Sequence, residues 1–283
     1  MKNAVVVAGN GPSIKEIDYS LLPDDYDVFR CNHFYLEDRY YLGKKIKACF
    51  FIAREFFEQY YMMQKLIQNG DYECEDIVCK MYNFQDRKEE VLRENFKYFF
   101  PIATNGYDVY FSKLKDLNAI IDFNVCYNLE RVEILTGTYA ICCAVASGYK
   151  EIYLAGMDFY EQGNSHFYSN YKMDLKETVI HHKNKDIEII NFLQKKYNVK
   201  IYSICPKSPI NNFIPLAKGI NNNIYKPIAK PQEAIKNKLL PSEKAIKRYK
   251  RMYLLSNSFV KFVYDILKTP SAIKKYFSKK YSR

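Results

Sequence analysis

The sequence lacks any apolar run long enough to cross a bilayer, which takes about 20 residues. Its first apolar run, residues 4–8, is also much shorter than the apolar core of a secretory signal peptide. We therefore expect a protein that is neither exported nor threaded through a membrane, and that works in the cytoplasm.

Zinc-ligand patterns are missing as well. The eight cysteines include no C-x-x-C pair and no cluster with histidine at zinc-ligand spacing. Most of them lie inside apolar stretches. We interpret them as reduced thiols of the core.

Basic charge is scarce in most of the chain and concentrated at its end. Residues 218–283 contain 17 lysines and arginines but 3 acidic residues, a net charge of +14, whereas the preceding 217 residues have a net charge of −3. A nucleic-acid-binding protein needs its positive charge on the folded surface that contacts the phosphates. The mildly acidic body therefore argues against a nucleic-acid partner.

Short apolar runs alternate with stretches of helical spacing through the first 217 residues. Strand patterns cover residues 5–8, 26–32, 46–52, 75–79, 151–159 and 199–205, and helical patterns cover 54–69, 88–99, 136–146 and 185–197. This alternation predicts an α/β fold with a single doubly wound, mostly parallel sheet, which binds its ligand at the carboxyl ends of the strands.

Two regions break the alternation. Residues 160–182 are polar, aromatic and aperiodic, which predicts a small lid over the site within a catalytic domain of residues 1–217. Residues 218–283 predict a linker and a basic helical tail. Within the tail, residues 250–267 have apolar side chains at helical spacing. Such a helix can lie on an anionic membrane surface, or instead pack on the body or on another subunit.

A candidate phosphate-binding loop follows the first predicted strand. Residues 8–13 read Ala-Gly-Asn-Gly-Pro-Ser, so backbone N–H groups lie beside the amide of Asn10. The loop matches neither the G-x-G-x-x-G fingerprint nor the P-loop, and a simple tight turn is the alternative. Asn32 and Asp158 follow other strands and are expected at the same sheet edge, although Asp158 is also a candidate cap for a helix or turn.

The four histidines include a pair, His181 and His182, just before a predicted helix. Asn184 is a candidate N-cap of that helix and Asp186 a first-turn acid. The positive end of the helix dipole disfavours a protonated imidazole, which suits a general base near pH 7. A surface histidine at a helix start is the alternative.

Taken together and in order, six motifs resemble the bacterial sialyltransferases of the Campylobacter lipooligosaccharide type, glycosyltransferase family 42. The motifs lie at residues 8–13, 26–32, 41–45, 148–153, 156–160 and 181–186. The resemblance implies a GT-A-like nucleotide-binding domain, no metal or other cofactor, and homo-oligomers. It also implies inverting transfer of sialic acid from CMP-sialic acid to a galactose-terminated glycan. The acidic triplet at 25–27 precedes its strand, so we interpret it as a solvated loop.

The resemblance also implies roles for single residues. It assigns His181 as the general base and Tyr160 as a hydrogen-bond donor to the phosphate. The residues expected to bind the nucleotide donor are Gly9, Asn10, Gly11, Ser13, Asn32, Thr136, Gly137 and Asp158.

Several positions depart from the family pattern. The family commonly has a second phosphate-binding tyrosine in the lid, for which His166 and Tyr168 are the candidates in this sequence. The active-site arginine of the family corresponds to Arg131 only if a short insertion is allowed. Residues 52–53 replace a polar position after the third strand. His182 is an alternative base if the lid shifts by one residue.

The expected partners are therefore CMP-sialic acid, a glycan acceptor such as lipooligosaccharide, and the inner face of the bacterial inner membrane. One alternative is a transferase for another CMP-activated sugar acid, such as Kdo. The other is a non-catalytic relative that binds nucleotide or membrane.

Overall fold

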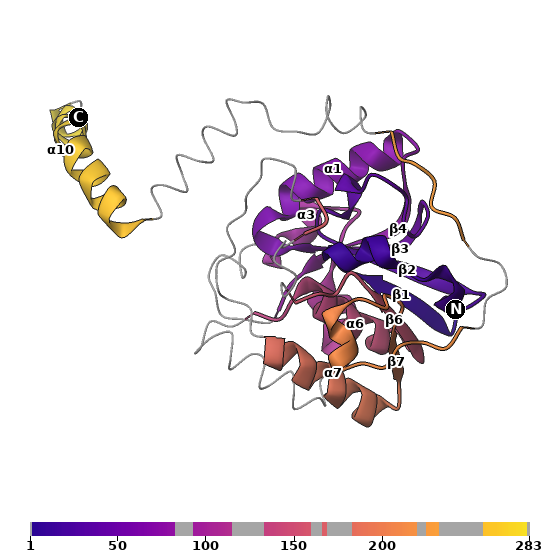
Figure 1. Cartoon of the computed structure of the whole chain (residues 1–283). Coiled ribbons are helices and arrows are strands. Elements are labelled where there is room, and N and C mark those ends of the chain that lie inside the picture. The colour runs from indigo at the N-terminus through magenta and orange to yellow at the C-terminus, as the bar shows by residue number, and fades with distance from the viewer. Residues whose placement is uncertain are drawn as a thin grey trace. The chain divides into compact units, whose positions relative to one another are not determined.

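The computed structural model describes residues 2–82, 93–114, 133–159, 166–168, 183–219, 225–231 and 257–281. The chain forms two compact units, Met1–Lys230 and Pro231–Arg283 (Figure 1). The first unit contains the sheet, and the second contains one long helix.

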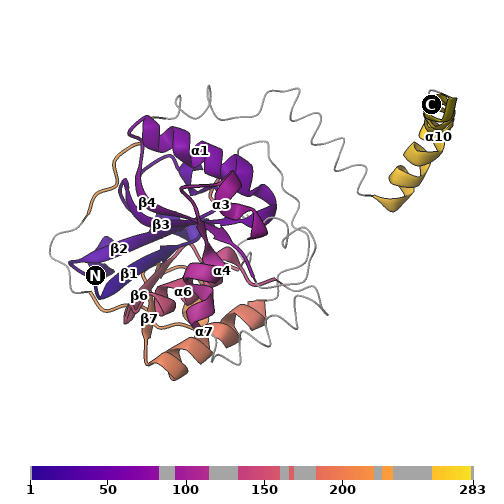
Figure 2. The ribbon, with the colours of Figure 1, turned by 180° about the vertical axis from the view of Figure 1, so that it is seen from behind.

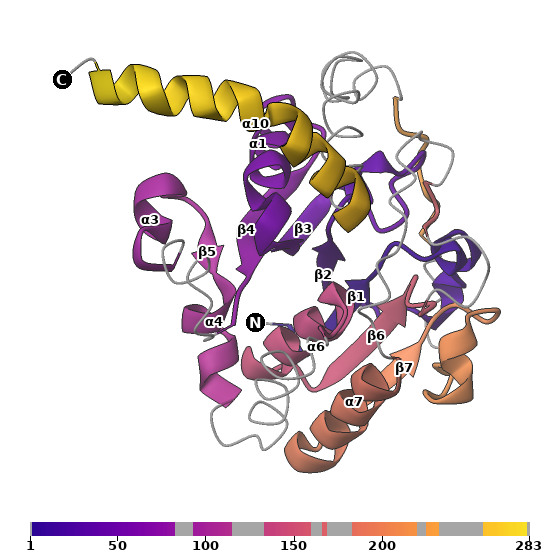
Figure 3. The same cartoon turned by 90° about the vertical axis from the view of Figure 1, so that its left-hand side faces the viewer.

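The first unit is built on a parallel sheet of seven strands in the order β5-β4-β3-β2-β1-β6-β7 (Figure 3). The strands are β1 Ala4–Ala8, β2 Tyr26–Cys31, β3 Lys45–Ile52, β4 Glu73–Lys80, β5 Thr104–Asn105, β6 Glu151–Ala155 and β7 Lys200–Ser203. Every pairing between these strands is parallel. The prediction of a doubly wound, mostly parallel α/β sheet is confirmed.

Helices cover both faces of the sheet, so the inner strand β1 is apolar along its whole length. The α-helices of this unit are α1 Phe56–Gln68, α3 Phe96–Phe99, α4 Gly106–Val109, α6 Thr136–Ala146 and α7 Lys183–Tyr197. Short 3-10 helices span Pro12–Glu16, Tyr19–Leu21, Phe34–Leu36, Ala53–Glu55, Phe111–Leu114 and Pro209–Asn212. Figures 1 and 2 show α1 on one side of the sheet and α6 and α7 on the other. All five residues of β1 are buried as a result.

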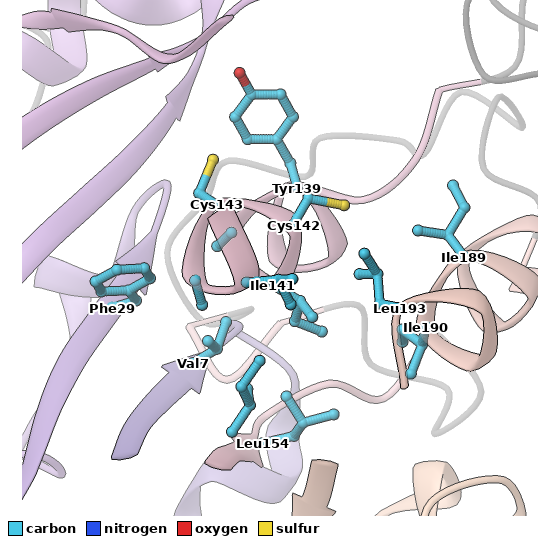
Figure 4. Packing of buried hydrophobic residues seen from close by; sticks show 14 of the residues in the cluster. Val7, Phe29, Tyr139, Ile141, Cys142, Cys143, Leu154, Ile189, Ile190 and Leu193 are labelled. Carbon is cyan, nitrogen blue, oxygen red and sulfur yellow. The ribbon is translucent and has the colours of Figure 1, made fainter. Parts of the chain in front are cut away.

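The main core lies between the sheet and the two helices α6 and α7. Ile141 of α6 lies between Val7 and Leu154 of the strands and Leu193 of α7 (Figure 4). Ten of the eleven residues of α6 are buried, which explains why its sequence is apolar and small on all sides. Burial of each large aliphatic side chain contributes about 1.5–3 kcal/mol, so α6 is held firmly in place.

Two features of the sheet were not predicted from the sequence. The strand expected over residues 151–159 ends at Ala155, because Gly156 turns the backbone with a φ of 60°. The short strand β5 was not predicted, since two residues give no periodic signal.

The first unit continues beyond Ala217, where the sequence placed the end of the catalytic domain. Residues 225–230 contact the body, where Tyr225 donates its hydroxyl to the Tyr40 carbonyl at 2.7 Å and Tyr40 N–H donates to the Ile228 carbonyl at 2.9 Å. Lys230 is buried and donates to the Tyr72 hydroxyl at 3.0 Å. The compact unit therefore ends at Lys230, while the functional division of the chain stays a prediction.

The second unit contains α10, Ser258–Tyr281, whose N-terminus is capped by the Asn257 side chain. The helix lies later in the chain than the expected segment of residues 250–267. Its apolar side chains are exposed, with Phe259 at 74% and Leu267 at 72%. In the part of the chain that the structure describes, no helix is long and apolar enough to cross a membrane.

Candidate donor-binding site

A pocket lies at the carboxyl edge of the sheet, where the strand order reverses between β1 and β6. Such a switch point is the usual ligand site of a doubly wound sheet, because the loops after the two strands diverge there. The lining residues are Gly9, Asn10, Gly11, Cys31, Asn32, Leu135, Thr136, Gly137, Gly156, Met157, Asp158, Phe159 and His166. The loop after β2 and the N-terminus of α6 complete the walls.

The loops after β1 and β6 are joined by backbone hydrogen bonds. Gly9 N–H donates to the Ala155 carbonyl at 2.9 Å, and Gly11 N–H donates to the Gly156 carbonyl at 2.8 Å. A Cβ atom at Gly11 would lie 2.4 Å from Oδ2 of Asp158, a distance that atoms in contact do not reach. The glycine is therefore required by the close approach of the two loops.

Asp158 joins the loop at residues 8–13 to the C-terminal part of the domain. Its Oδ2 accepts from Ser13 N–H at 2.8 Å and its Oδ1 accepts from the Ser208 hydroxyl at 2.7 Å. The side chain is buried. These contacts support the alternative of a structural cap. Asp158 also lines the pocket, and its contact with a nucleotide stays a prediction.

Asn10 and Asn32 present unpaired amide oxygens at the pocket. Asn10 donates through Nδ2 to the Cys31 carbonyl at 2.8 Å, and Asn32 donates through Nδ2 to Oγ1 of Thr136 at 3.2 Å. The Oδ1 atom of each asparagine is buried and has no hydrogen-bond partner among the described residues. A buried acceptor without a partner is costly, so both oxygens are suited to amino or hydroxyl donors of a ligand.

The N-terminus of α6 forms the wall beside Asn32. Thr136 and Gly137 begin the helix, and the N-cap residue, Leu135, makes no side-chain hydrogen bond to the first N–H groups. These groups and the helix dipole form a positive end that favours an anion such as a phosphate. The site thus combines an anion-binding end with two hydrogen-bond acceptors.

α7 begins at Lys183, so Asn184 is its second residue and the prediction of an N-cap there was wrong. Asp186 is in the first turn, as predicted, but it is buried and its Oδ1 accepts from Leu135 N–H at 2.9 Å. Burial raises the pKa of Asp186 to about 6, although the Thr138 hydroxyl, the Leu135 amide and the charge of Lys80 lower it.

The described part of the expected lid, residues 166–168, lies against the pocket. Phe167 N–H donates to the Asn10 carbonyl at 2.9 Å, and His166 lines the pocket and stacks on Tyr168 with ring centres 4.8 Å apart. Tyr168 is buried, contacts the ring of His33 and does not line the pocket. Burial, with the neighbouring His166, lowers the pKa of His33 to about 4, so this imidazole is neutral at pH 7.

The structure brings most of the predicted donor-binding residues together. All of them line the pocket except Ser13, whose N–H donates a hydrogen bond to the lining residue Asp158. Arg131, Tyr160, His181 and His182 lie outside the described residues.

Several lining residues were missed by sequence reasoning. Cys31, Leu135, Met157 and Phe159 line the pocket, but they are apolar and resemble core residues in the sequence. Phe159 adopts a left-handed backbone with a φ of 48°, a conformation that a bulky residue rarely adopts outside functional sites. Among the described residues, no group of three or more His, Cys, Asp or Glu side chains is placed to hold a metal ion.

Comparison with known proteins gives consistent matches over most of the chain. The family model for alpha-2,3-sialyltransferase (CST-I) matches residues 3–280. The sialyltransferase CstII from Campylobacter jejuni, solved with the substrate analogue cytidine-5'-monophosphate, is 44% identical, with 88% of this chain and 97% of that chain covered and a TM-score of 0.73.

Two further solved structures extend the likeness. CST-II in complex with a trisaccharide acceptor and CMP is 42% identical, with 87% of this chain and 98% of that chain covered and a TM-score of 0.72. The monofunctional alpha-2,3-sialyltransferase Cst-I from Campylobacter jejuni is 35% identical, with 91% and 95% covered and a TM-score of 0.73.

Proposed function

The chain belongs to the alpha-2,3-sialyltransferase (CST-I) family and is a glycosyltransferase that transfers sialic acid from CMP-sialic acid; we propose that the pocket between β1 and β6 binds this donor. The observation that carries the proposal is the pair of amide oxygens on Asn10 and Asn32, which have no hydrogen-bond partner among the described residues and lie in the same pocket as the N-terminus of α6. A cytidine nucleotide offers amino and hydroxyl donors for the oxygens and a phosphate for the helix end. The remaining donor contacts come from Gly9, Gly11, Ser13, Thr136, Gly137 and Asp158.

The leaving group in this reaction is CMP, a monophosphate. The N–H groups of α6 and the hydroxyl of Tyr160 stabilise the charge that develops on its phosphate, without a metal ion. His166, which lines the pocket, is favoured over the buried Tyr168 as the lid residue near the phosphate. Arg131 adds positive charge to the same region.

His181 acts as the general base. It removes the proton from the acceptor hydroxyl as the bond between the anomeric carbon and the phosphate oxygen breaks, and CMP leaves with the bonding electrons. Attack from the opposite face inverts the anomeric centre. The position of His181 just before α7 supports this role, because the positive end of a helix keeps a nearby imidazole unprotonated.

The acceptor is a galactose-terminated glycan, such as that of lipooligosaccharide, and the enzyme works at the inner face of the inner membrane. The exposed apolar and lysine side chains of α10 support peripheral binding to an anionic surface. We also propose a homo-oligomer, which light scattering after gel filtration will test.

Binding of CMP, measured by calorimetry, tests the donor site. Asn10→Ala and Asn32→Ala should each raise the Kd about tenfold, because each removes an acceptor in a buried site. Asn191→Ala, a change on the exposed surface of α7, is the control and should leave the Kd unaltered. Unchanged affinity in both pocket variants would place the donor elsewhere.

Transfer assays with CMP-sialic acid and a lactose-type acceptor test the chemistry. His181→Ala should abolish transfer, whereas His182→Ala should retain it, and the reverse result would assign the base to His182. The rate should be unchanged by EDTA if no metal takes part. Faster transfer from CMP-Kdo than from CMP-sialic acid would contradict the donor assignment.

A further inference from the structure

The peptide bond between Ile134 and Leu135 is held on both sides by buried side chains of opposite charge. The Ile134 carbonyl accepts a hydrogen bond from Nζ of Lys80 at 2.6 Å. The N–H of the same peptide, on Leu135, donates to Oδ1 of Asp186 at 2.9 Å. One peptide unit therefore connects the end of β4 to the first turn of α7.

Both charged residues are almost completely inside the protein. Lys80 is 3% exposed and Asp186 is 0% exposed. Among the described residues, Oε2 of Glu133 lies 3.7 Å from Nζ of Lys80, and the ring of Tyr82 lies 5.4 Å from it. Thr138 and Cys142 of α6 face Asp186. Buried charges cost several kcal/mol each unless they are paired and hydrogen-bonded, and the hydrogen bonds to the Ile134–Leu135 peptide offset part of this cost for both residues.

This peptide lies where the proposed donor site meets α7. Leu135 itself lines the pocket, together with Thr136 and Gly137, which begin α6. On the other side, Asp186 is in the first turn of α7, the helix that follows directly after His181 and His182 in the sequence. A shift of this peptide would move the anion-binding end of α6 relative to α7.

We propose that Lys80 and Asp186 are positioning residues that clamp the Ile134–Leu135 peptide, and that this clamp aligns the N-terminus of α6 for the phosphate of the donor. The clamp also polarises the peptide, since a cation on its oxygen and an anion on its N–H reinforce one another. Neither side chain lines the pocket. The inference rests on the proposed donor site at the α6 terminus.

A double-mutant cycle tests the clamp. Lys80→Met, Asp186→Asn and the double variant are compared with wild type in the Kd for CMP and in KM and kcat for transfer. Each single change should raise the Kd and the KM about fivefold or more, with a smaller effect on kcat. The Kd of the double variant should be close to that of the weaker-binding single variant and well below the value expected if the two fold-changes multiplied, because the effects of coupled residues in one network are not additive.

The matched control is Lys230→Met, another buried lysine that donates to a backbone carbonyl, that of Tyr35. It should alter the melting temperature without altering the Kd for CMP, so a mere loss of stability does not reproduce the expected result. Asp186→Asn keeps the size of the side chain and a hydrogen-bond acceptor at that position. If Lys80→Met does not fold, the Kd of Asp186→Asn for CMP tests the clamp by itself.

Three outcomes separate the clamp from the donor site itself. Weaker CMP binding in Asn10→Ala and in both clamp variants supports both proposals. Weaker binding in Asn10→Ala, with unchanged Kd in Lys80→Met and Asp186→Asn or with fully additive effects, overturns the clamp alone. Unchanged binding in Asn10→Ala and Asn32→Ala overturns the donor site, and with it the reason for the clamp.

Discussion

Replacing Asp186 with asparagine should make the folded protein more stable at neutral pH while weakening the donor site. Burial raises the pKa of this carboxyl from its ordinary 3.8 to about 6. Each tenfold change in proton affinity corresponds to about 1.4 kcal/mol, so keeping Asp186 ionised in the folded state costs about 3 kcal/mol at pH 7. Asparagine has nearly the same shape and carries no charge, so it avoids this cost.

The sign of the pH dependence follows from the raised pKa. The folded protein binds a proton at Asp186 more tightly than the unfolded chain does, so protonation of Asp186 stabilises the folded state. This contribution is complete below about pH 4 and is lost as the pH rises through about 6. The asparagine variant does not titrate there. The free energies of unfolding of the variant and wild type should therefore be similar near pH 4, and the variant should become increasingly more stable than wild type up to pH 7.

Thermal unfolding followed by circular dichroism between pH 4.5 and 7.5 measures this difference, and comparing the two proteins at each pH cancels all other titrating groups. For a unit of this size about 3 kcal/mol corresponds to roughly 5–10 °C in Tm. A difference in Tm that stays constant over this range, or a variant that is less stable at pH 7.5, would refute the reasoning. The increase in stability should accompany the weaker CMP binding expected above, since functional sites often keep arrangements that cost stability.

Further predictions concern the rest of the chain. Burial lowers the pKa of Lys230 from 10.5 to about 8, so its contribution to stability is present above about pH 10.5 and is lost as the pH falls through 8. Wild type should therefore gain stability from pH 8 to pH 10, while Lys230→Met does not titrate there, so the Tm of the variant minus that of wild type should fall over this range. A constant difference in Tm would contradict this. Gly11→Ala should push Asp158 out of place and weaken CMP binding at least tenfold in calorimetry, whereas Gly219→Ala, whose Cβ would meet nothing closer than 3.6 Å, should bind normally. Changing the lysines of α10 at 261, 268, 274 and 275 to glutamate should abolish co-sedimentation with phosphatidylglycerol vesicles, since each cation near the surface contributes about 1 kcal/mol. Transfer to a soluble acceptor should be unchanged. Retained sedimentation of the variant would contradict membrane binding through these lysines, and a wild-type protein that stays in the supernatant would argue for a helix that packs on protein.

Periodicity in the sequence was enough to predict the main elements of the sheet. The strands β1 to β4 and β7, and the helix over residues 136–146, were predicted to within about two residues. These elements have strong local signals, because strands buried on both faces and a helix buried all round are apolar along their length. The order of the motifs also identified the family, and the loops after β1 and β2 were placed at the correct sheet edge.

Pairs of residues far apart in the chain were decided only by the tertiary structure. The partner of Asp158 at Ser13 is 145 residues away, and Lys80 meets the Ile134 carbonyl across 54 residues. In the sequence, Lys80, Asp186 and Lys230 look like ordinary surface charges. Their burial follows from how β4, α7 and the segment at 225–230 pack.

The sequence by itself determined the fold class, the family and the loop that lines the pocket, because each depends on local patterns of apolar, glycine and asparagine residues. Only the tertiary structure decided that Asn10 and Asn32 line the same pocket as the α6 terminus, and that a lysine and an aspartate bind the peptide just before it. Hydrogen bonds and charge pairs of this kind form between side chains and backbone groups that only folding brings within 3 Å of one another.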